Sequence, residues 1–382
     1  MRRRGIMRPD EPGGERRGRR WRLRILASIG GTLFGLLTSL YSAELREILE
    51  AYGRGFMDAG LPVAITAVVA SVSGVVIYEY GFRRRHRGQV TEGEIEIRAD
   101  ALDGLIHDED AVVGRSLRYL ETRRFSEDLL VFLHGLGLDA NDFRSYMAES
   151  RYHCIALTQY GFNASERGDA HYQPISLESH VQLLGYALRR IQQTYPRKRI
   201  TLVGFSFGAD MVGFLLEHAR EVFDEVRLRK VVMLDPNVSN ATTTISSRIA
   251  EMDSDHSIRD LIGILRSART AEEFRYRCDY LSKITSKNFA QVRRHARDVV
   301  ERFRQRSFGP FLDAIGQLDA TAEEGVRVVL SIDHETVFNA VARAAAERGL
   351  DVNHLESSGT DHFALLNPDF LKRRLEQPPS WA

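Results

Sequence analysis

Cysteine is scarce in this sequence, with Cys154 and Cys278 as the only two among 382 residues. Two cysteines so far apart provide neither a disulfide framework nor the spacing of a metal site, so both are expected to be thiols of the protein core. Net charge is also nearly absent, because 53 Lys and Arg residues balance 52 Asp and Glu residues. This balance argues against a nucleic-acid-binding protein. No metal and no organic cofactor is expected.

Charge is missing altogether from two runs near the N-terminus, residues 25–41 and 61–78. Each run is close to the shortest length that spans the hydrocarbon core of a bilayer. Ten arginines precede the first run, in a segment at 1–24 that is expected to be disordered, and four more lie between 83 and 87. Because positive charge favours the cytoplasmic side, this pattern predicts a transmembrane hairpin at 25–82.

The hairpin would consist of helices at about 25–41 and 61–80. It would place the N-terminus and the rest of the chain in the cytoplasm, at the inner membrane if the cell is bacterial. Two other interpretations stay open. The first run could be a cleaved signal peptide ending at Ala43, although the bulky Tyr41 matches the small-x-small cleavage pattern poorly. The runs could also be buried helices of a soluble protein. The cores of soluble proteins, however, seldom contain two uncharged runs of this length that are flanked by arginine clusters.

A serine lies between two glycines in Gly204-Phe205-Ser206-Phe207-Gly208. The β-branched, apolar run 200–203 precedes this pentapeptide, and residues 209–218 have the pattern of a helix. A serine nucleophile typically lies in such a strand–turn–helix. The turn is so sharp that it leaves no room for side chains two positions before and after the serine, which explains the glycines. The pentapeptide alone is weak evidence, since average composition produces it in about one of eight chains of this length.

From about residue 90, short β-like runs alternate with helical ones, which is typical of an α/β domain. The continuously apolar run 129–133 indicates a strand that is buried on both faces, and it leads into His-Gly-Leu-Gly at 134–137. The runs 93–97 and 116–122 alternate with a period of two, as edge strands do.

Between residues 238 and 320 this alternation gives way to helices, among them one that begins with the capping box Thr270-x-x-Glu273. An apolar strand resumes at 326–332. We therefore expect a helical lid at 238–320, inserted between two parts of one α/β core at 83–237 and 321–382.

With these elements in place, residues 115–375 resemble the α/β-hydrolase superfamily. The sequence at 134–137 resembles the oxyanion loop of the family, and the one at 204–208 resembles its nucleophile turn. A third motif, Gly359-Thr-Asp-His362, resembles the histidine loop that follows the last strand. The resemblance implies an α/β-hydrolase fold, a mostly parallel sheet with helices on both faces and an inserted lid, here preceded by two transmembrane helices.

The resemblance implies that Ser206 is the nucleophile and that His362 is its base. His334 and His354 also lie near strand ends, but His362 alone has the loop-to-helix context of the family motif. His134 would help to form the oxyanion loop and is not expected to be the base.

Two aspartates are candidates for the triad acid. Asp333 follows the strand 326–332, where the family usually has this residue, and it is the favoured candidate. Asp235 ends the preceding strand, a position that a minority of the family uses. The oxyanion hole would consist of the backbone N–H groups of Leu136 and Phe207. Phe207 and Phe205 would either form an apolar floor of the site or pack against the sheet.

The predicted function is a membrane-anchored serine hydrolase that cleaves a carboxylic ester through an acyl-enzyme. Its expected partners are a lipid-like acyl ester and the bilayer. An acyltransferase, a thioesterase or amidase, and a non-catalytic membrane scaffold remain alternatives. The stretch 283–306 contains eight Lys and Arg residues and only two acidic residues. This stretch could bind anionic headgroups, but a solvated helix face is the favoured interpretation.

Overall fold

The computed structural model describes residues 88–102, 108–167, 169, 171–252, 257–266, 268–304, 307–351 and 354–376. The basic segment 1–24 and the hairpin at 25–82 lie outside these residues, so both stay predictions. Within the described ranges, no helix combines the length and the apolar character that crossing a bilayer requires.

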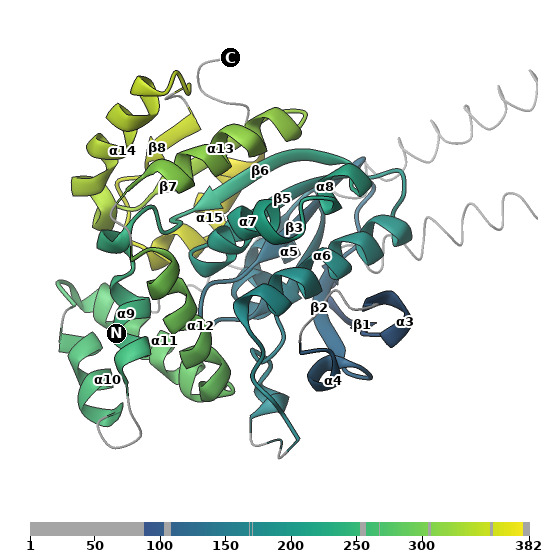
Figure 1. The fold of residues 1–382 in the computed structure, drawn as a ribbon, viewed down its shortest axis with the longest axis horizontal. Coiled ribbons are helices and arrows are strands. Elements are labelled where there is room, and N and C mark those ends of the chain that lie inside the picture. Colours follow the sequence, from purple (N-terminus) through teal and green to yellow (C-terminus); the bar gives the residue numbers. More distant parts are fainter. Residues whose placement is uncertain are drawn as a thin grey trace, which may run out of the picture. The chain divides into compact units, whose positions relative to one another are not determined.

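The described strands form one eight-stranded sheet, in the order β1-β2-β4-β3-β5-β6-β7-β8 (Figure 1). The neighbours from β4 to β8 are parallel, and β2 is antiparallel to both β1 and β4. Of the two strands predicted at an edge, β1 lies there and β2 lies one place further in. The strands are β1 (Thr91–Glu96), β2 (Ser116–Thr122), β3 (Asp128–Leu133), β4 (His153–Thr158), β5 (Arg199–Phe205), β6 (Leu228–Leu234), β7 (Val326–Leu330) and β8 (Leu355–Ser357).

The handedness of the crossovers assigns the helices to the two faces of the sheet. The connection from β3 to β4 runs toward β2, whereas the next one returns across β3 to β5. Right-handed crossovers therefore place α5 and α6 on opposite faces. α15 contacts α5, and α7 contacts both α6 and α13. The helices are α3 (Ala99–Leu102), α4 (Glu109–Val112), α5 (Arg144–Glu149), α6 (Leu177–Thr194), α7 (Phe207–His218), α8 (Val222–Glu225), α9 (Thr244–Glu251), α10 (Ser257–Arg266), α11 (Ala271–Thr285), α12 (Phe289–Arg302), α13 (Gly309–Thr321), α14 (Glu335–Glu347) and α15 (Pro368–Glu376).

Because helices cover both faces, the central strands are apolar along their whole length. Every residue of β7 is buried, and so are all but the first residue of β3 and of β5. Burial at roughly 25 cal/mol per Å² of apolar surface makes these strands the main source of stability and a rigid base for the loops at their ends.

The insertion between β6 and β7 begins with four helices, α9 to α12, which pack on one another and which we call the lid helices (Figure 1). Half of the predicted capping box of α11 is present, since the Thr270 hydroxyl accepts a hydrogen bond from the Glu273 N–H at 3.1 Å. The Glu273 carboxylate accepts the Arg269 N–H at 2.7 Å, and not that of Thr270. The fifth helix, α13, packs against β6, β7 and α7 instead. The range 238–320, predicted as a lid, thus includes one crossover helix of the sheet layer.

Candidate active site

The sequence motifs meet at the carboxyl ends of neighbouring parallel strands, where α/β sheets form their sites. His134 follows β3, Ser206 follows β5 and Asp235 follows β6. Asp333 lies in a short 3-10 turn after β7, and His362 lies in the loop after β8. Residues more than 200 positions apart in the chain are therefore gathered on one edge of the sheet.

The backbone of Ser206 is strained. Its φ of 51° and ψ of −120° lie outside the regions that side chains favour, at the junction of β5 and α7. The Ser206 N–H donates to the Leu234 carbonyl at 2.7 Å, and the Ser206 carbonyl accepts from the Ala209 and Asp210 N–H groups. These bonds hold the turn between β6 and the first turn of the helix, so the conformation is fixed from both sides.

The two glycines of the pentapeptide are required by space. A Cβ atom on Gly204 would lie 2.5 Å from the Gly208 carbonyl oxygen, and one on Gly208 would lie 2.2 Å from the Leu133 carbonyl oxygen. Both obstacles are backbone atoms, which cannot rotate away. The turn therefore brings β3, β5 and α7 closer together than any side chain at these positions allows.

Gly208→Ala is expected to destabilise the protein by about 3 kcal/mol or more, because β3 or α7 must shift. Gly213→Ala is the matched control on the same helix, since a Cβ there meets no atom within 4 Å. Alanine at that helical position should stabilise by about 0.5–1 kcal/mol. Denaturant unfolding of the two variants measures both effects, and equal stabilities would contradict the close packing at Gly208.

His362 is held by Asp235. The Nδ1 atom of the ring lies 2.5 Å from Oδ2 of Asp235, and the ring packs against Phe205 and Phe363 with centroid distances of 4.7 and 5.0 Å. Within the described residues, Nε2 of His362 and the hydroxyl of Ser206 make no hydrogen bond. Such contacts are often long in the absence of substrate. Asp235 thus holds Nδ1 of the imidazole, and Nε2 has no hydrogen-bond partner among the described residues.

Asp235 is buried and serves two histidines. Its Oδ1 accepts from the Ser331 N–H at 2.7 Å and lies 2.9 Å from Nδ1 of His334, while Oδ2 faces His362. Burial alone raises the pKa of Asp235. The close contacts of Asp235 with His334 and His362 and the charges of these rings outweigh burial, and they hold its pKa well below the ordinary value. The carboxylate therefore stays ionised at neutral pH.

Asp333, the favoured acid in the sequence, does not contact the ring of His362. Its side chain is 30% exposed and pairs with Arg269 of the lid segment, and its Oδ2 accepts the backbone N–H of His362 at 3.1 Å. The structure places Asp235, the alternative candidate, at the imidazole of His362, and the assignment of the triad acid stays a prediction. Asp235 has a positive φ of 52°, and its side chain is fully buried.

His334→Gln tests the second partner of Asp235. Burial lowers the pKa of His334, but the close contact with Asp235 and the charge of its carboxylate outweigh burial and raise this pKa above 6.5. A raised pKa means that His334 contributes stability fully below pH 6.5 and loses it as pH rises through the folded-state value. His334→Gln should therefore lower Tm by a few degrees at pH 6 and by less than half as much at pH 9. A difference in Tm that grows with pH would contradict this.

The predicted oxyanion donors are available. Neither the Leu136 N–H nor the Phe207 N–H donates a hydrogen bond to any other described residue. The loop before Leu136 is held by His134, whose Nε2 accepts the Gln159 N–H at 3.0 Å while Nδ1 faces the Gly135 carbonyl at 2.8 Å. Burial lowers the pKa of His134 to about 4, so this ring is neutral and structural. Two free N–H groups at the end of a strand and the start of a helix suit a developing negative charge.

The lid helix α11 holds the oxyanion loop. The buried hydroxyl of Tyr280 donates to the Leu136 carbonyl at 2.9 Å, and its ring lies 5.0 Å from that of Phe363, next to His362. A Cβ at Gly137, whose φ is 78°, would lie 2.5 Å from the side chain of Ile284. Sequence reasoning did not single out Tyr280. The pattern of apolar residues within α11 can indicate that Tyr280 is buried. It cannot indicate that the partner of Tyr280 is Leu136, which lies 144 residues earlier in the chain.

Two lysines of the stretch 283–306 are committed to this loop. Lys283 Nζ lies 2.5 Å from Oδ1 of Asp142, and the buried Lys287 pairs with Asp139. Burial raises the pKa of Asp139, but the charge of Lys287, its hydrogen bond and the backbone N–H of Asn141 outweigh burial and lower this pKa. Lys287 is buried, whereas Lys283 is 36% exposed and also pairs with Asp279 of the same helix at 2.9 Å. The basic character that remains in this stretch comes from arginines.

Phe205 and Phe207 are fully buried and do not form an open floor. Phe207 stacks on His295 of α12 at a centroid distance of 5.4 Å, and His295 in turn lies 2.6 Å from His180 of α6, between Nε2 and Nδ1. Burial lowers the pKa of both histidines, so the pair is neutral. This contact, which sequence reasoning missed, joins the lid helices to the residue that follows Ser206.

A mostly parallel sheet with a strained serine turn after β5, an oxyanion-type loop after β3 and a histidine after the last strand defines an α/β hydrolase. Residues 130–374 match the model of a family described as "Alpha/beta hydrolase family". The chain belongs to this family, and it is a hydrolase of the α/β superfamily. No curated protein is similar enough in sequence to count as a relative.

Several solved structures are similar to this chain at low identity. A membrane phospholipase A, described as a bacterial virulence factor, is 13% identical with a TM-score of 0.42, and the match covers 80% of this chain and 93% of that one. A carboxylesterase of the thaumarchaeon Nitrososphaera gargenis is 14% identical, with a TM-score of 0.47 and coverages of 66% and 89%. A haloalkane dehalogenase variant from Bradyrhizobium elkanii is 13% identical, with a TM-score of 0.45 and coverages of 75% and 95%. None of the three assigns a substrate to this chain.

Proposed function

We propose that the protein is a serine hydrolase that cleaves carboxylic esters, with Ser206 as nucleophile, His362 as base and Asp235 as acid. The observation that carries this proposal is the contact of Asp235 with Nδ1 of His362, next to the strained serine turn. A buried, ionised carboxylate at Nδ1 keeps the proton on that nitrogen. Nε2 is then left as the basic atom that can accept the proton of a serine hydroxyl.

The proposed reaction has two steps, formation of an acyl-enzyme and its hydrolysis. Ser206 Oγ attacks the acyl carbon while Nε2 of His362 takes the hydroxyl proton, and the oxyanion is bound by the Leu136 and Phe207 N–H groups. His362 returns the proton to the leaving alkoxide, which departs as the alcohol. A water molecule then adds to the acyl-enzyme in the same way and releases the carboxylic acid and the free serine.

A bilayer anchor would determine which esters reach this site. The two uncharged runs at 25–41 and 61–78 and the arginines that flank them support a hairpin with its ends in the cytoplasm. A site held at the membrane surface receives acyl substrates that partition into the bilayer, so we propose a lipid-like ester. Fusion of a reporter to the C-terminus tests the orientation. A reporter that is active only outside the cytoplasm would overturn it.

A fluorophosphonate probe tests the chemistry without knowledge of the substrate, because it reacts with an activated serine. The full-length protein should be labelled at Ser206, as mapped by mass spectrometry of the digested chain. It should also hydrolyse p-nitrophenyl esters, and a series of acyl lengths from acetate to palmitate would measure the preference for lipid-like chains.

The same assay separates the alternatives. Transfer of the acyl group to an added alcohol would indicate an acyltransferase, and faster cleavage of thioesters or anilides would change the substrate class. A folded protein that is neither labelled nor active on any of these esters would contradict the proposed enzyme and leave the non-catalytic scaffold.

A further inference from the structure

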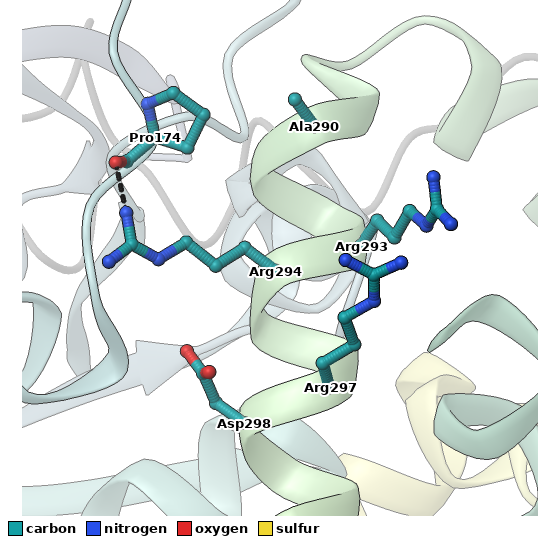
Figure 2. A pocket seen from close by; sticks show the side chains of 6 residues that line it. All are labelled: Pro174, Ala290, Arg293, Arg294, Arg297 and Asp298. Carbon is teal, nitrogen blue, oxygen red and sulfur yellow. Dashed lines mark hydrogen bonds between the residues drawn. The ribbon is translucent and has the colours of Figure 1, made fainter. Parts of the chain in front are cut away.

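A pocket lies on the outer side of lid helix α12, where the loop before α6 passes it (Figure 2). It has a volume of about 380 Å³, within the range of small-molecule sites. Its lining consists of Pro174, Ala290, Arg293, Arg294, Arg297 and Asp298.

Within the part of the chain that the structure describes, the three arginines of this pocket have no carboxylate partner. Arg294 donates to the Pro174 carbonyl and Arg297 donates to the Ala250 carbonyl at 3.2 Å, both of which are neutral acceptors. Nε of Arg293 is enclosed and has no hydrogen-bond partner. Among the described residues, no Asp or Glu oxygen lies within 4 Å of any of the three guanidinium groups. The three guanidinium groups therefore form no ion pair with a described carboxylate.

The one acidic residue of the lining is engaged elsewhere. Oδ2 of Asp298 accepts the Leu177 N–H at 3.2 Å, at the start of α6, and lies 3.6 Å from Nδ1 of His295. Three guanidinium charges and one carboxylate leave the lining with a net charge of about +2.

This pocket is separate from the Ser206 site. The arginines occupy the outer face of α12, whereas Gln291 and His295 occupy the buried face, where His295 stacks on Phe207. A ligand in the pocket would contact the outer face of α12, whereas the buried face of this helix packs against Phe207, the residue after Ser206. It would thus bind to the lid helices without occupying the acyl site.

We propose that this pocket binds a dianionic phosphate group, as inorganic phosphate or as the monoester of a small molecule or lipid. The planar fork of arginine pairs with two oxygens of one phosphate, and the net charge of the lining matches the charge of a phosphate monoester at neutral pH. The volume leaves room for a small polar group beside the phosphate. This proposal does not depend on the proposed esterase activity.

Binding to the full-length protein in a non-ionic detergent tests the proposal. One arm titrates inorganic phosphate and glycerol 3-phosphate, and the other uses mixed micelles that contain phosphatidic acid or phosphatidylcholine. Sodium chloride at equal ionic strength controls for screening. A phosphate ligand at about a hundred times its Kd should raise Tm by about 3–5 °C, and calorimetry should give a saturable isotherm. Binding in the soluble arm indicates a free phosphate ligand, and binding in the phosphatidic acid arm alone indicates a lipid headgroup.

The double variant Arg293→Gln with Arg297→Gln should weaken binding at least tenfold. Its matched control is Arg190→Gln with Arg304→Gln, which removes the same charge from two exposed positions outside the pocket and should bind as the wild type does. Should the first variant fold poorly, Ala290→Glu places a carboxylate at an exposed position of the lining and should block binding with little effect on stability. Equal binding by the wild type and the pocket variants, or no effect beyond that of chloride in either arm, would overturn the proposal.

Discussion

Ser206→Ala is expected to lower kcat for a soluble p-nitrophenyl ester by about 10⁶-fold, because removal of an activated serine abolishes the acyl-enzyme route. The residual rate would come from the oxyanion donors at Leu136 and Phe207, which the substitution leaves in place. Fluorophosphonate labelling should disappear together with the activity. A variant that retains more than a hundredth of the wild-type kcat would exclude Ser206 as the nucleophile.

Ser206→Gly provides the control for this result. Its loss of activity should equal that of Ser206→Ala, but glycine adopts a positive φ without strain. Relief of the conformation at φ 51° should therefore leave Tm equal to or above the wild-type value. A stable and inactive Ser206→Gly would show that the missing hydroxyl, and not a damaged fold, accounts for the loss.

The serine turn was predictable because its causes are local. The glycines, the serine and the apolar run before them determine a strand–turn–helix within a dozen residues. The structure adds only the atoms that a Cβ would meet at Gly204 and Gly208. The buried strand that leads to His134 and the N-cap of α11 at Thr270 were predictable for the same reason.

What sequence reasoning could not supply depends on contacts between distant segments. The helical periodicity of α13 is no different from that of the lid helices, yet α13 packs on β6 and β7. The contact of Tyr280 with Leu136 and that of His295 with His180 each join residues more than 100 positions apart. A pattern of apolar residues within one helix indicates which face of the helix is buried. It does not indicate which other segment that face packs against.

The choice between Asp235 and Asp333 was a question of this kind, since both follow apolar strands at the correct end of the sheet. Their contacts separate them. The carboxylate of Asp235 contacts Nδ1 of His362, whereas Asp333 accepts the backbone N–H of that residue. Exposure also differs, with 0% for the side chain of Asp235 and 30% for that of Asp333. A buried carboxylate can fix a tautomer, and a solvated one is screened.

Asp235→Asn should therefore lower kcat by about 10⁴-fold. Its amide can still accept the Ser331 N–H, but it then presents an NH₂ group to Nδ1 of His362 and favours the wrong tautomer. The fold should persist, because the amide matches the carboxylate in size. Near-UV circular dichroism and Tm would establish this alongside the kinetics.

Asp333→Asn is the matched variant, and its kcat should stay within about fivefold of the wild-type value. The amide oxygen can still accept the His362 N–H, and the lost ion pair with Arg269 is solvent-exposed and worth about 0–1 kcal/mol. If Asp333→Asn lost activity by the larger factor and Asp235→Asn by the smaller one, the contact seen in the structure would not be the one that supports catalysis. Equal and large losses would mean that the negative charge of Asp333 supports catalysis as strongly as the carboxylate at Nδ1 of His362.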